Sequence, residues 1–454
     1  MKIQSFSPSN NKLIGTVDIT TDKEIAEAIK KAKMTQTAWA NFPLQKRLEH
    51  MKNLSGVFAK NQEQLAKQIA EEMGMPINEA RGDVESGLNY LNWYIDNAEK
   101  CLQDDITFQA DGETHRVIYE PKGVVASIVP WNFPFSNFVW QGCQNLIVGN
   151  AVIMKHSELT PICSKLIADL VAKSTLPKNV FTMVYGDGVI GEKLAKSNID
   201  HICFTGSTAV GKQLYKIAAE NFISIGMELG GSAAGIVFVD ADIDNVLDSI
   251  FLNKFSNCGQ ICDGLKRLIV HKDKFEEVVE KLKIMTESKK VGNALSEDTE
   301  IGPLVSVKQL DILVEQVKSA TDSGAKIIAG GKKLDIDNGN FYSPTLLTNI
   351  NTKSKIWTEE VFGPALPIVQ FKTIEEAIQL ANNTRYGLGG YVFTEDKKLF
   401  ERVSKDLKTG MVSWNNCVYV IPQNPFGGTK ESGLGRNHGK WGFHELCNVK
   451  VVTF

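Results

Sequence analysis

The stretch Ile202-Cys203-Phe204-Thr205-Gly206-Ser207 places a short apolar run directly before a glycine and a serine. A run of this length before turn residues is typical of a buried strand, and serine is a favoured first residue of a helix. The same pattern recurs, with helical segments between the runs, at Val124–Val129, Ala151–Met154, Val180–Tyr185 and Ile202–Thr205. Strands that alternate with helices predict a parallel sheet with helices on both faces.

The alternation begins again after Gly231. Six further runs are expected to be strands: Ala234–Val239, Leu265–Val270, Lys326–Ile328, Leu366–Phe371, Gly390–Phe393 and Gly410–Trp414. A chain of 454 residues is too long for one ordinary core, so two or three domains are expected. The second series of strands therefore predicts a second α/β domain.

Helices are expected before and within the first sheet. Thr21 with Glu24 makes a capping box ahead of apolar residues at helical spacing. Longer helical stretches run from about Leu44 to Glu72 and from about Val84 to Leu102. A further helix is expected over Ser136–Val148.

Two segments predict a small antiparallel element. Residues Ile106–Glu120 alternate in polarity around a turn at Ala110-Asp111-Gly112, which predicts a β-hairpin. The last residues, Val449–Phe454, are rich in β-branched side chains and are expected to form a strand. A strand at the edge of a sheet has unpaired backbone groups that need a partner.

The composition argues against several classes of protein. With a net charge of −3 and no basic tail, nothing points to nucleic acid. No apolar run approaches the ~20 residues that span a bilayer, so no membrane partner is expected. The eight cysteines are scattered as in a reduced, cytoplasmic protein. The seven histidines lack His-x-x-x-His spacing, so no metal is expected.

Two glycine-rich turns suggest a nucleotide. Gly186-Asp187-Gly188-Val189-Ile190-Gly191 has the spacing of a dinucleotide loop, although that short pattern also fits a plain tight turn. Gly206–Lys212 nearly matches the phosphate loop of ATPases, but Gln213 stands where a hydroxyl is needed for magnesium, which argues against an ATPase. The amides and dipole of the helix that opens at Ser207 would still attract a phosphate.

The chemical signal lies in Asn257-Cys258-Gly259-Gln260-Ile261-Cys262, together with Met227-Glu228-Leu229-Gly230-Gly231. An ionised cysteine is a strong nucleophile, and a carboxylate held near it can activate water. Pro130-Trp131-Asn132-Phe133-Pro134 adds an amide donor on a stiff backbone, which suits an oxygen that gains negative charge. Taken singly, these residues could be a buried hydrophobe, a surface acid and a helix cap.

Together these segments resemble the aldehyde dehydrogenase superfamily over most of the chain. Phe204–Ser207, Glu360-Val361-Phe362-Gly363-Pro364 and the stretch from Pro425 to Arg436 are similar to its signatures, in the same order. His156 and the tail from Phe443 to Asn448 look like the short bacterial NAD(P)-dependent succinate-semialdehyde dehydrogenases. The resemblance implies an enzyme that oxidises an aldehyde to the carboxylic acid with NAD(P)+.

The resemblance also implies roles for three catalytic residues. Cys262 attacks the aldehyde, a hydride leaves for the nicotinamide, and a thioester remains. Glu228 then activates the water that releases the acid. Asn132 and the backbone amide of Cys262 form the oxyanion hole. Cys258, four residues before Cys262, is a candidate for a reversible disulfide with it.

The cofactor-binding residues implied by the resemblance are Trp131, Lys155, Ser157, Glu158, Gly186, Gly206, Ser207, Gly211, Leu229, Glu360 and Phe362. Lys155 and Glu158 would contact the adenosine ribose, although they could also form a solvated salt bridge. Glu360 would hold the nicotinamide ribose. Because a carboxylate suits ribose hydroxyls and repels a 2′-phosphate, Glu158 favours NAD as the cofactor over NADP.

The resemblance implies a domain organisation as well. A Rossmann-like NAD(P)-binding domain is expected over residues 1–105 and 122–228, and a catalytic domain over residues 229–424. The hairpin at residues 106–121 and the terminal segment at residues 440–454 are expected to form an oligomerisation element, which implies a homodimer or homotetramer.

The substrate is expected to be a small-molecule aldehyde. An arginine is expected near the carboxylate of an acidic aldehyde, yet the helix over Ser136–Val148 contains no basic residue. Aromatic residues at Phe138, Trp140, Trp414 and Tyr419 could line a pocket for an apolar or aromatic aldehyde instead, or could belong to the core. Succinate semialdehyde therefore stays open, and so does a medium-chain or aromatic aldehyde.

Two other functions are disfavoured by the sequence. A fold retained for binding or structure is disfavoured because Cys262 and Glu228 are both present. Transfer to coenzyme A is disfavoured because Glu228 is suited to activate water.

Overall fold

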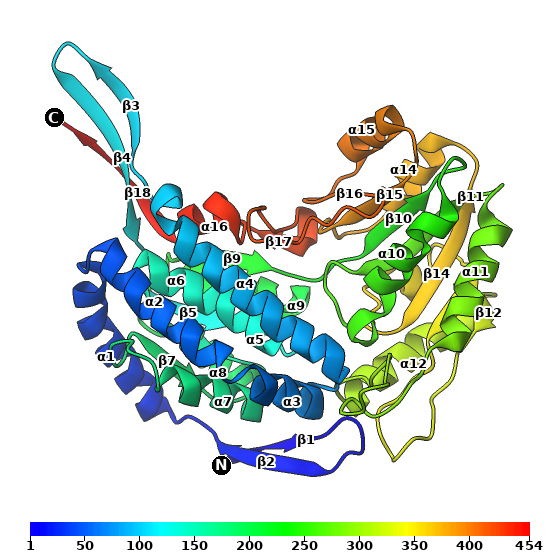
Figure 1. The fold of residues 1–454 in the computed structure, drawn as a ribbon, viewed down its shortest axis with the longest axis horizontal. Coiled ribbons are helices and arrows are strands. Elements are labelled where there is room, and N and C mark those ends of the chain that lie inside the picture. Colours follow the sequence, from blue (N-terminus) through cyan, green and yellow to red (C-terminus); the bar gives the residue numbers. More distant parts are fainter.

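Figure 1 shows the fold in a computed structural model that describes all 454 residues, Met1–Phe454. The first helix, α1 (Asp22–Ala40), begins after Thr21. The Glu24 amide donates to the Thr21 hydroxyl at 3.3 Å, and the Thr21 amide donates to the Glu24 carboxylate at 2.7 Å. These two hydrogen bonds confirm the capping box.

The helix predicted from Leu44 to Glu72 was wrong in extent. It is two helices, α2 (Leu44–Ala59) and α3 (Gln62–Met73), because the chain turns at Lys60 and Asn61. The next helix, α4 (Ile77–Cys101), starts before the predicted Val84.

The helix predicted over Ser136–Val148 is present but irregular. It consists of α5 (Pro134–Asn137), a π-helical segment η1 (Phe138–Cys143) and α6 (Gln144–Val148). A π-helical turn is wider than an α-helical one, so it rotates the side chains that follow it relative to the helical spacing read from sequence.

The first large sheet has six strands. In spatial order they are β17 (Gly433–Leu434), β9 (Ser224–Glu228), β8 (His201–Thr205), β5 (Val124–Ile128), β6 (Ala151–Lys155) and β7 (Phe181–Val184). All neighbours are parallel except β17 and β9. The four strands predicted here are confirmed, whereas β9 and β17 were missed.

Alternate residues of this sheet face two separate cores. Val125 of β5 belongs to a cluster of 43 buried residues shared with α2, α3, α4 and α7 (Pro161–Val171). Its neighbours Val124 and Ala126 belong to a cluster of 20 shared with α1, α8 (Gly188–Ala195) and α9 (Thr208–Glu220). Helices therefore cover both faces of the sheet, as predicted.

The second large sheet has seven strands, β12 (Lys326–Ala329), β13 (Thr345–Thr348), β14 (Ala365–Phe371), β11 (Leu265–His271), β10 (Ala233–Val237), β15 (Gly390–Phe393) and β16 (Ser413–Trp414). All neighbours are parallel except β12 and β13. The accompanying helices are α10 (Ile243–Phe255), α11 (Phe275–Ser288), α12 (Val307–Asp322), α13 (Lys355–Thr358), α14 (Ile374–Asn382) and α15 (Lys397–Asp406). The predicted α/β class is confirmed, and β13 was missed; the domain limits stay a prediction.

A third sheet projects from the body of the molecule (Figure 1). It contains β18 (Cys447–Thr453), β4 (Glu113–Pro121) and β3 (Asp105–Ala110), in that order. The hairpin turn has positive φ at Asp111 and Gly112, which confirms the turn prediction. The terminal strand follows α16 (Gly439–Glu445) and pairs with β4.

Two short strands near the amino terminus, β1 (Lys2–Phe6) and β2 (Leu13–Asp18), form a separate ribbon that was not predicted. Among all the helices, none combines the length and the apolar character needed to cross a bilayer.

Candidate active site

A cavity of about 250 Å³ lies between the two large sheets. Nine of the fourteen predicted site residues line it: Trp131, Asn132, Gly206, Ser207, Glu228, Leu229, Cys262, Glu360 and Phe362. The first sheet turns its carboxyl-terminal edge to this cavity, since Asn132 follows β5, Gly206 follows β8 and Glu228 ends β9.

The strand order explains why the cavity forms there. From β5 the chain proceeds to β6 and β7 on one side, and then crosses to β8 and β9 on the other side. The connections after β5 and β8 therefore leave the sheet in opposite directions, which opens a crevice at the carboxyl ends of these strands.

The second sheet turns its amino-terminal edge to the same cavity. Cys262 lies just before β11, Glu360 just before β14, and Gly230 just before β10. Residues far apart in sequence thus meet because each lies at the near end of its strand.

Cys262 is half-buried in the cavity wall. Its thiol lies 3.7 Å from a carboxylate oxygen of Asp263. Burial raises the pKa of the Cys262 thiol well above its usual range, and the Asp263 and Glu360 carboxylates add to this shift. Lys266 opposes the shift, so the charges around the thiol decide how readily it ionises.

Cys258 lies in a different environment. It is 1% exposed and belongs to the buried cluster under the second sheet, and it does not line the cavity. Burial raises the pKa of its thiol. The proposed disulfide with Cys262 stays an untested hypothesis.

Asn132 is held by the loop that carries Cys262. Its side-chain amide donates to the Gln260 carbonyl at 3.0 Å, and the Asn257 side chain donates to the Asn132 carbonyl at 2.9 Å. It does not cap the following helix, whose N-terminal position is Phe133. The backbone of Asn257 donates in turn to Glu79 of α4 at 2.6 Å, so three segments fix the amide.

Glu228 is buried, and its Oε2 atom has no hydrogen-bond partner. Burial raises the pKa of this carboxyl well above its usual range, while Arg436 partly offsets the effect. A buried carboxylate without a partner costs free energy in the folded state. Its position in a cavity wall fits a group that exchanges a proton with a bound molecule.

The amino-terminal end of α9 faces the cavity through Gly206 and Ser207. The Ser207 hydroxyl accepts from the Val210 amide at 3.4 Å and caps the helix. One turn further, a side chain at Gly211 would meet Leu229 at 2.6 Å, so this glycine lets Leu229 lie against the helix.

The side chain of Glu360 extends from the loop before β14 to the backbone that follows β9. Its Oε1 accepts from the Gly231 amide at 3.1 Å, and its backbone carbonyl accepts from Gln316 of α12 at 3.0 Å. Burial raises the pKa of the Glu360 carboxyl, and Lys266 lowers it. A side chain at Gly230 would meet Oε2 of Glu360 at 2.5 Å, so only glycine leaves room for this carboxylate.

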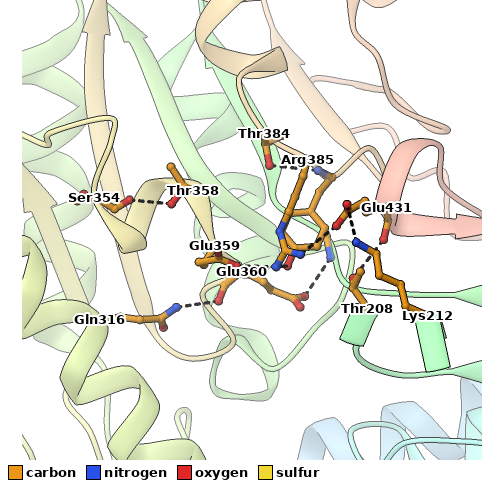
Figure 2. A network of polar contacts seen from close by, with 12 residues as sticks. Thr208, Lys212, Gln316, Ser354, Thr358, Glu359, Glu360, Thr384, Arg385 and Glu431 are labelled. Atoms are coloured by element: carbon orange, nitrogen blue, oxygen red, sulfur yellow. Dashed lines mark hydrogen bonds and ion pairs between the residues drawn. The ribbon is translucent and has the colours of Figure 1, made fainter. Parts of the chain in front are cut away.

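Figure 2 shows the surface network beside Glu360. Arg385 pairs with Glu359 at 2.6 Å and with Glu431 at 2.9 Å, and Lys212 of α9 pairs with Glu431 at 2.7 Å. Each exposed pair contributes about 1 kcal/mol at most. Together they join α9, the loop before β14 and the carboxyl-terminal segment around the cavity.

Trp131 and Phe362 close the cavity between the two sheets. Their rings meet edge to face with centroids 5.5 Å apart. The backbone carbonyl of Phe362 accepts from Gln309 at 2.9 Å.

Five predicted cofactor residues lie outside the cavity lining: Lys155, Ser157, Glu158, Gly186 and Gly211. Lys155 ends β6, where its carbonyl accepts from Val129, so it belongs to the same carboxyl-terminal edge as Asn132. Its ammonium pairs with Glu158 at 3.1 Å. The lysine side chain is 5% exposed and that of Glu158 is 42% exposed, so solvent reaches the pair from the glutamate side only.

Ser157 and Gly186 lie in the turns after β6 and β7, at that edge of the sheet. The Ser157 hydroxyl accepts from the Leu159 amide at 3.2 Å. A side chain at Gly186 would meet Ile190 at 2.1 Å, so Gly186 allows α8 to pack closely on the strand before it.

Three of the four aromatic residues suggested for the pocket are not part of the cavity lining. Phe138 is completely buried in the core between helices, and Trp414 stacks on Phe400. Trp140 does line the cavity, whereas Tyr419 stands behind Asp263 and is not part of the lining.

Several lining residues were missed, among them Asn137, Asp263, Gln309, Phe426, Asn437 and His438. Asp263 could have been found, since it directly follows the predicted nucleophile. His438 could not, because its side chain reaches the cavity from a left-handed backbone position with φ 65° after the last signature.

Comparison with known proteins identifies the family of this chain. The model of the aldehyde dehydrogenase family matches residues 1–452. The chain is 34% identical to aminoaldehyde dehydrogenase 1, peroxisomal, of Pisum sativum, over 100% of this chain and 92% of that protein. It is 31% identical to the NADP(+) succinate-semialdehyde dehydrogenase GabD of Escherichia coli, over 99% and 94%.

A crystal structure of aldehyde dehydrogenase from Brucella melitensis biovar abortus 2308 superposes with a TM-score of 0.96 at 33% identity, covering 100% of this chain and 94% of that one. The chain therefore belongs to the aldehyde dehydrogenase family, as predicted. It is an NAD(P)-dependent enzyme that oxidises an aldehyde to the carboxylic acid.

Proposed function

We propose that Cys262 is the nucleophile, Glu228 the base that activates water, and Asn132 an oxyanion donor of this oxidation. The observation that supports this assignment most directly is that the three side chains line one cavity although they come from three distant segments. The test is NAD(P)H formation from aldehydes by the wild-type protein and by Cys262→Ala, as developed in the Discussion.

In the first half of the reaction the Cys262 thiolate adds to the aldehyde carbon, and the carbonyl oxygen becomes negative. Asn132 can donate its amide to that oxygen, because Gln260 and Asn257 already fix its orientation. The backbone amide of Cys262 is the second donor. Preorganised donors of this kind contribute about 3 kcal/mol each to the stability of the transition state.

In the second half the acyl group on Cys262 is released as the acid. Glu228 takes a proton from water while the water attacks the thioester carbon. Burial keeps the pKa of Glu228 high, so its ionised form is a stronger base than an exposed carboxylate.

The residues around the cavity fit NAD(P). Gly206 and Ser207 offer the amino-terminal end of α9 to the pyrophosphate, and Gly230 leaves space where Glu360 can reach a ribose. Trp131, Gly211, Leu229 and Phe362 would shape the channel, with Lys155, Ser157, Glu158 and Gly186 at the adenosine end. When bound, NAD(P)+ would be the oxidant that accepts the hydride from the substrate carbon.

We expect NAD to be preferred over NADP because the Glu158 carboxylate would repel a 2′-phosphate. Replacing Glu158 by Gln removes the charge and keeps the shape, so the preference for NAD in kcat/KM should fall by about tenfold. Initial rates with both cofactors measure this ratio. Glu192→Gln on α8 is the control, and a wild-type preference for NADP would contradict the prediction.

The substrate of this chain cannot be taken from its relatives. The names of the two relatives compared above indicate substrates with tails of opposite charge, an amine in one and a carboxylate in the other. Succinate semialdehyde and an uncharged medium-chain or aromatic aldehyde both remain proposals. The cavity lining contains no lysine or arginine, which argues against an acidic tail.

We also propose a homodimer or homotetramer held by the projecting sheet. Val449 and Val451 lie two residues apart on one face of β18, and both are more than 60% exposed. Exposed apolar rows on an edge strand favour association. Val449→Lys with Val451→Lys should convert the assembly to a smaller species in size-exclusion chromatography with light scattering. Lys450→Ala, which alters the salt bridge to Glu120, should not.

A cytoplasmic location stays a proposal. It is supported by eight cysteines that are all free thiols.

A further inference from the structure

Asp263 places a carboxylate in the wall of the cavity beside the nucleophile. The residue is 8% exposed, and its carboxylate lies 3.7 Å from the Cys262 thiol. Its backbone carbonyl accepts from the hydroxyls of Tyr391 at 2.9 Å and Tyr419 at 3.4 Å. These hydrogen bonds fix the backbone of Asp263 at the cavity wall.

The proposed mechanism does not use this carboxylate. No water-activating role remains for it once Glu228 is assigned, and it raises the pKa of the thiol that must ionise. A group that hinders the nucleophile is expected to serve another purpose at the same site.

The charges around the cavity are unbalanced. Its lining contains the carboxylates of Glu228, Asp263 and Glu360 but no lysine or arginine. Burial raises the pKa of the Asp263 carboxyl and the charge of Lys266 lowers it, but the Lys266 ammonium donates to the Gly259 carbonyl at 3.1 Å and forms no ion pair with Asp263 or Glu360. A buried carboxylate without an ion pair is costly unless a bound cation completes it.

Aromatic rings lie near this carboxylate. Burial and the Asp263 charge raise the pKa of Tyr90, whose ring packs against Trp140 and His438 at centroid distances of 5.7 and 4.8 Å. Phe133, Trp140, Phe426 and His438 line the cavity. Trp140 and His438 lie 5.5 Å apart between ring centroids, and Phe426 and His438 lie 5.9 Å apart. Aromatic faces attract cations, most strongly where water is excluded. Because burial lowers the pKa of His438 to about 3, its ring is neutral and does not oppose a cation.

Two neutral hydrogen-bond donors in the cavity lining favour an acidic aldehyde instead. The side-chain amide of Asn137 and the indole nitrogen of Trp140 are buried and lack acceptors. They could bind the carboxylate of an acidic aldehyde. That carboxylate would share the cavity with Asp263 and find no cation there, so its desolvation would be poorly compensated.

We propose that the aldehyde oxidised by this enzyme carries an ammonium group at its far end, and that Asp263 binds this group within the aromatic end of the cavity. The inference rests on the proposed role of Cys262, since it places the aldehyde carbon at that thiol. It makes Asp263 a substrate-binding residue that selects the charge of the tail.

The test compares kcat/KM for four aldehydes with wild type and Asp263→Asn. The aldehydes are aminopropionaldehyde, trimethylaminobutyraldehyde, succinate semialdehyde and uncharged butanal. For wild type we expect a cationic aldehyde to exceed butanal by at least about tenfold, because the Asp263 carboxylate attracts the positive charge of either tail at close range. In Asp263→Asn this ratio should fall to about one, while butanal is still oxidised.

Using butanal as the reference separates tail recognition from any change in the reactivity of Cys262. The exposed Asp248→Asn on α10 should leave every ratio unchanged. A wild-type preference for butanal or succinate semialdehyde, or a cation preference that survives in Asp263→Asn, would overturn the proposal. Oxidation of none of the four aldehydes would instead overturn the proposed function.

Inhibition of the wild-type enzyme provides a second measurement that does not depend on a variant folding. A butyltrimethylammonium ion should compete with butanal, and butyrate at the same concentration should not. Stronger inhibition by butyrate would count against the amine and favour an acidic tail.

Discussion

Replacing Cys262 by alanine abolishes steady-state formation of NADH from every aldehyde, and it removes any initial burst as well. Without the thiol no covalent adduct can form, so the fall in kcat should be at least about a thousandfold. The measurement is absorbance of NADH in stopped-flow and steady-state assays. Wild-type kcat/KM should rise with pH, because burial raises the thiol pKa and only the thiolate attacks.

Cys258→Ala is the matched control, since it removes a second thiol from the same loop. Cys258 is buried in the core of the second sheet and does not line the cavity. Its loss should lower thermal stability by about 1 kcal/mol and leave kcat within a few-fold of wild type. Activity that survives in Cys262→Ala but disappears in Cys258→Ala would move the nucleophile to Cys258.

The position of Cys262 shows how much of the site could be predicted from sequence. Cys262, Glu228 and Asn132 were predicted together because the segments around them resemble the aldehyde dehydrogenase superfamily, and each lies beside a turn that contains glycine or proline. Such turns follow or precede strands, and in parallel sheets the strand ends gather at one edge. The structure brings all three residues to one cavity, although their catalytic roles still await experiment.

Errors occurred where tertiary packing overrides local spacing. The break at Lys60 and Asn61 has no proline or glycine to announce it, so two helices were read as one. Phe138, suggested either for a pocket or for the core, lies in the core at the start of the π-helical segment. Strand β13, at Thr345–Thr348, is only four residues long and lacked a clear alternating pattern.

One part of the cavity wall could not be predicted at all. Asn437 and His438 reach it through a turn whose conformation follows from contacts with the rest of the chain. A hydrogen bond of 2.5 Å joins Nδ1 of His438 to the hydroxyl of Tyr94. Tyr94 lies on α4, more than 300 residues earlier in the sequence. No local pattern encodes such a contact.

Glu228→Gln should separate the two halves of the reaction. The amide can neither take a proton from water nor carry charge, so the thioester on Cys262 should accumulate. We expect a burst of about one NADH per active site, followed by a steady-state rate about a hundredfold to ten-thousandfold below wild type. Stopped-flow absorbance measures the burst, and mass spectrometry of the quenched protein detects the acyl group.

The burst amplitude distinguishes a variant that cannot release the acid from a variant that is misfolded. A misfolded variant would lose the burst and the steady rate together, whereas a variant impaired only in releasing the acid keeps the first. Glu220→Gln, at an exposed position of α9, should behave as wild type. Because a protonated Glu228 cannot accept a proton, acid release in the wild type should slow as pH falls through its raised pKa, and the Gln variant should lose this dependence. Loss of the burst in a Glu228→Gln variant that is folded would assign Glu228 to the first half of the reaction instead.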